Sequence, residues 1–373
     1  AGEEFNINSP KKIWGILRKD VVLSVSLLCA LASCFAVTPS LSYLEYIDFN
    51  TLILLFCLML IIAGLSEQEF FRFIGCRVLK HAKSRRQIIA VLVFLCFFAS
   101  MLITNDVALI TFVPFAVMVL KMASLEGSVC MTVTLLTIAA NLGSMFTPIG
   151  NPQNLYLYSL SSMSFLSFMQ LMFPYTLTAA LLLALCIFIF NKRQLLQLQE
   201  IEMPYICIKD VTFYLMLFVF CLLSVAGIVQ KPYLLVIVGA AVAWKEKHLF
   251  LKADYALLLT FVFFFIFIGN MNQVEWLHAL ILQLIEGHER IISIAASQII
   301  SNVPAAMLLS NYTAQVSELI IGTNLGGLGT LIASMASLIS YKQIVHCYPD
   351  QKGRYLLLFT ALNVLFLLIL LFV

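Results

Sequence analysis

One acidic residue is set apart from the other charges of this sequence. Of the 19 Asp and Glu residues, only Asp106 lies deep inside an apolar segment, where an ionised group costs several kcal/mol unless it is solvated or paired. Its neighbours Thr104 and Asn105 offer oxygen atoms and no positive charge. The expected partner is therefore a cation, either Na⁺ bound by oxygens or a proton that neutralises the carboxylate. The same carboxylate could instead cap the helix that follows it, and the two roles can coexist.

The most polar stretch within an apolar segment runs from Thr147 to Asn154. It contains Pro148 and Pro152, which cannot continue the hydrogen-bond ladder of a helix, so a break in a membrane helix is predicted. The amides in and near this stretch are neutral and suit recognition without a fixed charge: Asn141, Asn151, Gln153 and Asn154. Thr147, Asn151 and Asn154 are therefore candidate substrate-binding residues.

Two short motifs recur in the second half of the chain in the same order. Ile103-Thr104-Asn105 matches Ile300-Ser301-Asn302, and Asn141-Leu142-Gly143 matches Asn324-Leu325-Gly326. Both copies of the Ile-Thr/Ser-Asn motif interrupt an apolar segment. Both copies of the Asn-Leu-Gly motif lie in the long apolar segment that follows. The polar groups of the second half that correspond to the first break are Thr323, Asn324, Ser334 and Ser337. Gly143 and Gly326 of the second motif could allow the backbone to approach a ligand, or they could serve only for close packing of helices.

The elements that must position these residues are membrane helices. Of the 373 residues, 62% are hydrophobic and 11% are charged, whereas a soluble domain has about 45–50% apolar and about 25% charged residues. This composition excludes a soluble enzyme or a nucleic-acid binder, because a globular protein needs a polar exterior. Continuous apolar stretches near the roughly 20 residues of a span predict an all-α polytopic membrane protein, with about nine full spans and two re-entrant hairpins.

The basic residues orient these elements, because cytoplasmic loops carry an excess of Lys and Arg. We take residues 1–20 as a cytoplasmic N-terminus, and residues 88–121 and 289–314 as hairpins that each enter and leave on one side. All of the 22 Lys and Arg residues except Lys231 and Arg290 then fall on the cytoplasmic side. The C-terminus is predicted to be extracellular, and the protein to reside in the cytoplasmic (inner) membrane.

The same assignment predicts two inverted repeats. Residues 21–193 form the first, with a broken helix at 128–158, and residues 231–373 form the second, with a broken helix at 318–341. Residues 194–230 provide a linker and a connecting span. Inverted repeats with broken helices at matching positions are typical of secondary transporters, whose site lies near the bilayer midplane between the repeats. Interrupted backbone is tolerated there because it lines a cavity or meets a ligand.

Three runs of residues resemble the ion-transporter superfamily. They are Thr104-Asn105-Asp106-Val107-Ala108-Leu109, Asn141-Leu142-Gly143 followed by Thr147-Pro148-Ile149-Gly150-Asn151-Pro152, and Ser301-Asn302-Val303-Pro304-Ala305. That superfamily includes arsenite permeases, citrate–metal transporters, sodium/proton antiporters and divalent anion:sodium symporters. The resemblance covers both halves of the chain. It implies an elevator-type homodimer in which a scaffold domain supports a mobile transport domain that holds both hairpins.

The resemblance also implies roles at the hairpin tips, which carry Ser-Asn-Thr in the dicarboxylate symporters. The first two residues of that motif bind Na⁺ and the last two contact substrate. The positions retained in this chain are Thr104, Asn105, Ser301 and Asn302. The third positions are Asp106 and Val303, which are poor hosts for a dicarboxylate. Asn-Asp followed by Ala-Leu is more similar to the arsenite-permease branch, where proton coupling is expected.

We therefore expect a secondary active transporter for a small inorganic or organic anion, coupled to Na⁺ or H⁺ and using no other cofactor. Arsenite efflux, Na⁺/H⁺ antiport through Asp106 and a passive channel are alternatives. An enzyme is not expected, because intramembrane proteases need paired acids or an HExxH motif. The candidate substrate residues are Asn105, Asp106, Thr147, Asn151, Asn154, Asn302, Val303 and Ser334. The candidate cation ligands, for Na⁺ if a metal binds, are Thr104, Asn105, Asp106, Asn141, Gly143, Ser301, Asn302, Thr323 and Asn324.

Overall fold

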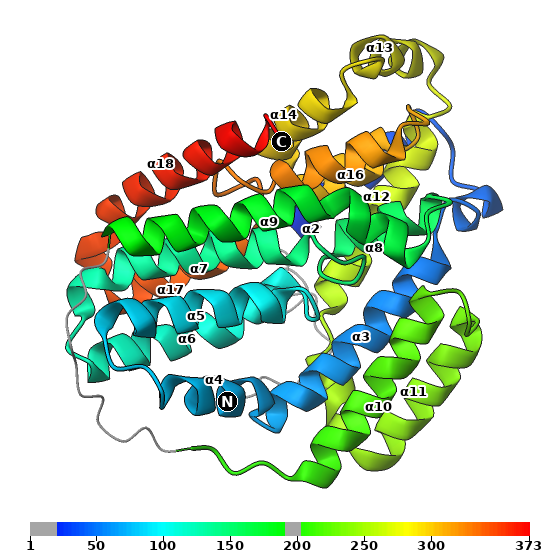
Figure 1. Ribbon diagram of the computed structural model, residues 1–373. Coiled ribbons are helices and arrows are strands. Elements are labelled where there is room, and N and C mark those ends of the chain that lie inside the picture. The colour runs from blue at the N-terminus through cyan, green and yellow to red at the C-terminus, as the bar shows by residue number, and fades with distance from the viewer. Residues whose placement is uncertain (1–20, 191–202) are drawn as a thin grey trace. The chain divides into compact units, whose positions relative to one another are not determined.

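The computed structural model describes residues 21–190 and 203–373, whose path is drawn in Figure 1. Within these ranges the regular structure is helical and includes no strand, which confirms the all-α prediction. The predicted N-terminal segment and the start of the linker lie outside the described residues. Helices long and apolar enough to cross a membrane are Phe49–Glu67, Asn105–Met122, Glu126–Ser144, Phe165–Phe190, Ile208–Val225 and Pro349–Leu370. With shorter apolar helices beside them, the protein is a polytopic membrane protein.

The described residues form two compact units, each assembled from separate stretches of sequence. The first unit comprises residues 21–67, 209–286 and 307–313, and the second comprises the remaining described residues. Each unit therefore takes residues from both halves of the chain.

Apolar helices build the first unit. Its elements are α2 (Val21–Ser33), α3 (Phe49–Glu67), α10 (Ile208–Val225), α11 (Lys231–Lys245), η3 (Lys247–Lys252), α12 (Tyr255–Met271) and α13 (Glu275–Ile285). Helix α2 packs against α12, and α3 packs against α11. The buried Asn270 amide of α12 donates hydrogen bonds to Ser33 Oγ and Tyr43 OH, both at 2.9 Å. These bonds join α12 to the end of α2 and to Tyr43. They give partners to an amide nitrogen that would be costly to bury alone.

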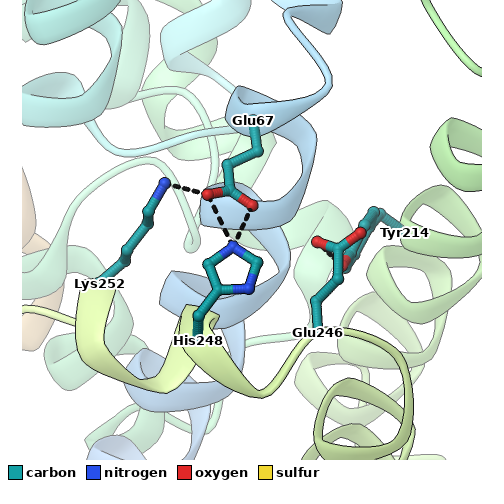
Figure 2. A network of polar contacts seen from close by, with 5 residues as sticks. All are labelled: Glu67, Tyr214, Glu246, His248 and Lys252. Atoms are coloured by element: carbon teal, nitrogen blue, oxygen red, sulfur yellow. Dashed lines mark hydrogen bonds and ion pairs between the residues drawn. The ribbon is translucent and has the colours of Figure 1, made fainter.

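A polar cluster lies where η3 meets the end of α3 (Figure 2). The Glu67 carboxylate contacts Nε2 of His248 at 2.7 and 2.9 Å and the Lys252 ammonium group. The Tyr214 hydroxyl donates to Glu246 at 2.8 Å. Ligand atoms of Glu67, Glu246 and His248 lie within 4.8 Å of one another, which is a spacing compatible with a metal ion. Because Lys252 and Tyr214 already engage the two carboxylates, we interpret the cluster as an ion-pair network that fixes η3 to the end of α3.

The second unit is arranged around α7 (Val129–Ser144). This helix packs against α5, α6, α9, α16, α17 and α18 and buries all of its residues except Met131. The other elements are α4 (Phe70–Leu79), α5 (Arg85–Ser100), α6 (Asn105–Met122), α8 (Pro152–Leu160), α9 (Phe165–Phe190), α14 (Glu289–Ile300), the start of α15 (Asn302–Leu309), α16 (Val316–Leu325), α17 (Met335–Cys347) and α18 (Lys352–Leu370). A helix without an exposed polar face is expected at such a central position.

Helical structure stops at the places that carry the polar motifs. Helices α5 and α6 are separated by residues 101–104, and α14 and α15 by Ser301 alone, whose φ is +75°. Such a φ is uncommon for a residue other than glycine. Helices α7 and α8 are separated by residues 145–151, and α16 and α17 by residues 326–334. The second unit thus holds both interrupted helix pairs and the polar end of each hairpin.

The packing of α7 against α5 predicts that adding one methyl group at Gly143 destabilises the protein. A Cβ at Gly143 would lie 2.9 Å from the carbonyl carbon of Phe97 and still closer to its oxygen and to Ser100 Oγ. Gly143→Ala should therefore lower the melting temperature in detergent by roughly 1–4 °C, because overpacking costs about 1–3 kcal/mol. In α11, a Cβ at Gly239 would meet nothing within 4 Å, so Gly239→Ala should leave the melting temperature unchanged or raise it slightly. Equal effects of the two substitutions would contradict the packing argument.

Candidate functional site

The tip of the first hairpin lies in a cluster that we call the hairpin-tip cluster, composed of Asn105, Asn141, Gly327 and Ser334. Nδ2 of Asn105 donates to Oδ1 of Asn141 at 3.0 Å, and Ser334 Oγ donates to the same oxygen at 3.1 Å. Nδ2 of Asn141 donates to the Gly327 carbonyl at 3.4 Å. All three side chains are buried. Residues from the first hairpin, from α7 and from the break after α16 therefore share one hydrogen-bond network.

A second group, the asparagine triad, consists of Asn151, Asn154 and Asn324. Nδ2 of Asn151 donates to Oδ1 of Asn324 at 3.0 Å, and Nδ2 of Asn324 donates to Oδ1 of Asn154 at 2.6 Å. Oδ1 of Asn151 accepts from the Asn154 backbone at 2.9 Å and so caps α8, which begins at Pro152. Proline is well suited to the first position of a helix. The triad links the two helix breaks through neutral amides that are at most 2% exposed.

Each hairpin tip also contacts the break that follows it in the sequence. The backbone N–H of Asn105 donates to the Gly150 carbonyl at 3.2 Å, and that of Asn302 donates to the Ala333 carbonyl at 3.0 Å. Gly150 and Ala333 occupy equivalent positions after Asn141 and Asn324. In addition, Ser301 Oγ lies within hydrogen-bonding distance of the Ala333 carbonyl and of Asn302 Oδ1. The same backbone contact therefore holds both hairpin tips.

Asp106 lies in the first turn of α6, directly after the hairpin-tip cluster. Its backbone N–H donates to Oδ1 of Asn105 at 3.0 Å, and its side chain is partly exposed. Thr104 is the N-cap residue, and its side chain makes no capping bond. The positive end of the α6 dipole stabilises a carboxylate at this position. Asp106 therefore lies in the first turn of α6, where the helix dipole favours its charge, next to a residue of the hairpin-tip cluster.

The other candidate residues have more local contacts. Thr147 Oγ1 donates to the Met101 carbonyl at 2.5 Å, which joins the first break to the first hairpin. Thr323 Oγ1 donates to the Leu319 carbonyl of its own helix at 2.7 Å, and so does not extend either cluster. Val303 is buried beside Asn302 and offers no polar side-chain atom. The close approach of α7 to α5 explains why position 143 is a glycine.

Gln298 belongs to the site although the sequence motifs did not single it out. Its Nε2 donates to the Gly326 and Leu328 carbonyls at 2.8 and 2.9 Å, and its Oε1 accepts from the Thr330 backbone at 3.0 Å. One signal was available, because Gln298 is a polar residue near the end of an apolar segment, shortly before Ser301. Its partners are backbone groups, which a search for motifs does not reveal.

Comparisons with known proteins identify the family of the chain. The model of the citrate transporter family matches residues 12–336. An uncharacterized transporter of Methanocaldococcus jannaschii is 33% identical over 87% of this chain and 88% of its own length. The inner membrane protein YbiR of Escherichia coli is 31% identical over 79% of this chain and 80% of its own length. A silicon efflux transporter of rice, LSI3, is 33% identical over 38% of this chain and 30% of its own length. The chain therefore belongs to the citrate transporter family of the ion-transporter superfamily, and it is a multi-pass membrane transporter.

Proposed function

We propose that this protein is a secondary active transporter that moves a small anion across the cytoplasmic membrane, coupled to Na⁺ or H⁺. The observation that carries the proposal is the joining of two broken helices and a hairpin tip by buried neutral amides. Broken helices in a membrane are tolerated where their free backbone groups line a ligand site. Asn105, Asn151, Asn302 and Ser334 are the proposed substrate contacts, and Asp106 is the proposed site of the coupling cation.

The division into units supports an elevator mechanism. Both helix breaks and both hairpin tips belong to the second unit, which is proposed to be the mobile transport domain, with the first unit as the scaffold. We propose that the functional form is a homodimer. The excess of basic residues in alternate loops supports a cytoplasmic N-terminus and an extracellular C-terminus.

A second candidate is the efflux of a small oxyacid such as arsenite. The neutral lining of the two clusters favours it, because amides and hydroxyls can bind an uncharged, hydroxylated solute. The partial similarity to a relative named for silicon efflux agrees with this candidate.

Transport in proteoliposomes tests the proposal. A thermal-shift screen with citrate, other carboxylates, sulfate, phosphate and arsenite first selects a substrate. Radiolabelled uptake is then measured with a Na⁺ gradient, with a pH gradient and with neither. We expect accumulation above the equilibrium level with one of the gradients, and its loss when an ionophore collapses that gradient. Single-channel currents, or filling that stops at equilibrium under every gradient, would show that the protein is not a secondary active transporter.

A further inference from the structure

One short stretch of the second unit concentrates basic residues. Residues 70–86, which comprise α4, the following loop and the start of α5, contain six Lys and Arg residues. No Asp or Glu occurs between Phe70 and Asn105, and the preceding acid, Glu69, already pairs with Arg72 at 3.0 Å. Acidic residues of the same stretch therefore do not neutralise its charge. Its exposed Lys and Arg residues are Arg77, Lys80 and Lys83.

Helix α4 has a buried face and an outer face that also carries large apolar side chains. The buried face packs on α5 and α6 and consists of Phe71, Gly75, Cys76 and Leu79. The opposite face, at the helical spacing of about 100° per residue, is exposed or partly exposed and consists of Phe70, Phe73, Ile74, Arg77, Val78 and Lys80. With 10 residues, α4 is too short to cross a bilayer. Apolar and basic side chains on one exposed face are typical of a helix that lies at a membrane surface.

The start of α5 adds positive charge of a second kind. Its first two residues are Arg85 and Arg86, and its first turn contains no acidic residue. The N-terminal end of a helix already carries a partial positive charge, so basic residues there are unfavourable unless an anion lies nearby. Arg86 is held at the end of α9, because its guanidinium carbon lies 4.2 Å from the centre of the Phe188 ring and its Nη2 donates to the Phe188 carbonyl at 3.0 Å.

The loop between α4 and α5 is folded onto the first turn of α5. The Lys83 backbone N–H donates to Oε1 of Gln87 at 2.8 Å, and Ser84 Oγ accepts from the Gln87 backbone N–H at 3.4 Å. These bonds hold the basic loop at the positive end of the helix. The outer face of α4, loop residues 80–84 and the first turn of α5 thus form one continuous region, which we call the basic surface.

We propose that the basic surface binds the anionic phospholipids of the cytoplasmic leaflet. The excess of Lys and Arg places this region on the cytoplasmic side, where the leaflet has a negative surface potential that attracts basic side chains. The apolar side chains of the outer face enter the boundary between headgroups and acyl chains, while the basic ones reach the phosphate groups. Because α5 is the first arm of the hairpin that carries Asn105, bound lipid anchors the base of that hairpin.

A role in membrane insertion alone would account for the same basic residues. Lys and Arg orient a membrane protein while it is inserted, and that role requires no selective lipid contact afterwards. The two roles differ in the folded protein, because only a lipid-binding surface discriminates between anionic and zwitterionic headgroups.

A local fluorescent reporter tests the proposal in reconstituted vesicles. The three native tryptophans are replaced by phenylalanine, and Phe73→Trp places a single tryptophan on the outer face of α4. Its quenching is compared in phosphatidylcholine vesicles that contain equal fractions of brominated phosphatidylglycerol or brominated phosphatidylcholine. We expect phosphatidylglycerol to be enriched beside this tryptophan by about fivefold or more, since each nearby basic residue attracts anionic lipid.

Two changes should remove this preference. Arg77→Gln, Lys80→Gln and Lys83→Gln together delete three exposed charges, and quenching by the two lipids should then become nearly equal. Without any of these substitutions, NaCl at roughly 0.5 M should lower the preference at least about twofold, because the Debye length falls to about 4 Å. The salt measurement decides the matter if the triple variant does not fold.

The control reporter is Leu181→Trp in the same tryptophan-free background. Leu181 is 62% exposed and lies in α9, which carries no charged residue, so both lipids should quench it equally. Equal quenching at position 73 would overturn the proposal. A preference for phosphatidylglycerol that survives the triple substitution, or that is insensitive to salt, would overturn it as well. Quenching requires no transport, so failure of the proposed function would leave this result unaffected.

Discussion

Asp106→Asn is expected to abolish accumulation of substrate against its gradient while leaving the protein folded. The substitution keeps the size and polarity of the side chain but removes the group that can bind a cation or a proton in an apolar segment. Coupling between two ligands is typically worth about 5- to 150-fold in affinity. Gradient-driven uptake should fall by a factor in that range, and the accumulation ratio should approach about one because substrate can still equilibrate.

The measurement is uptake in proteoliposomes with and without the driving gradient, at matched protein incorporation. Asp254→Asn is the control, because Asp254 caps α12 by accepting from the Leu257 backbone at 2.9 Å, and asparagine is an equally good cap. Its uptake should match that of wild type. If Asp106→Asn accumulated substrate as wild type does, Asp106 would only supply a favourable charge in the first turn of α6.

Asn324→Leu is expected to cause the largest loss of stability among single substitutions in the asparagine triad. Asn324 donates to Asn154, accepts from Asn151 and also donates to the Ile320 carbonyl at 2.7 Å. Leucine would remove the donor to the buried Oδ1 of Asn154 and one of the two bonds of Asn151 Nδ2, whose other acceptor is Ser144 Oγ. The cost is about 1–3 kcal/mol for each buried group left unsatisfied. The melting temperature should fall by roughly 2–8 °C, and transport should be lost because the two breaks are no longer joined.

Asn363→Leu provides a matched comparison. Asn363 is also fully buried, but its Nδ2 donates only to the Phe359 carbonyl of its own helix. That carbonyl keeps its hydrogen bond within the α18 backbone. Loss of the Asn363 amide should therefore change the free energy of unfolding by about 1 kcal/mol or less. Thermal unfolding followed by intrinsic fluorescence distinguishes the two variants. Similar losses for both would mean that the triad contributes nothing beyond the burial of an amide.

Local features of the sequence predict much of the helical arrangement. Proline, glycine and asparagine between Thr147 and Asn154 predict the break between α7 and α8, because they act on the backbone of their own segment. The apolar run Phe165–Phe190 is a single helix with those bounds. The position of Asp106 at a polar interruption could likewise be predicted from its sequence neighbours alone.

The partners of the polar side chains could not be predicted in the same way, because they depend on packing between distant segments. Nothing local indicates that Asn324 bonds to Asn151 and Asn154, or that Gln298 reaches the carbonyls after α16. Thr323 illustrates the opposite case, since a helical threonine can bond to the carbonyl of the preceding turn, as Thr323 does to Leu319. Composition and motifs therefore do not distinguish a polar residue that bonds to distant segments from one that bonds within its own helix.

The nearly complete burial of α7 has a consequence for how the protein is made. Its membrane segment has a mean hydropathy of 1.4, the lowest among the candidate spans of the described residues, and 89% of it is buried. Polar residues such as Thr132, Thr137 and Asn141 give α7 little tendency to remain in lipid alone. Stable insertion of α7 during synthesis must therefore depend on neighbouring helices. Substitutions that weaken the contact of α5 with α7 should reduce the yield of inserted protein before they affect transport.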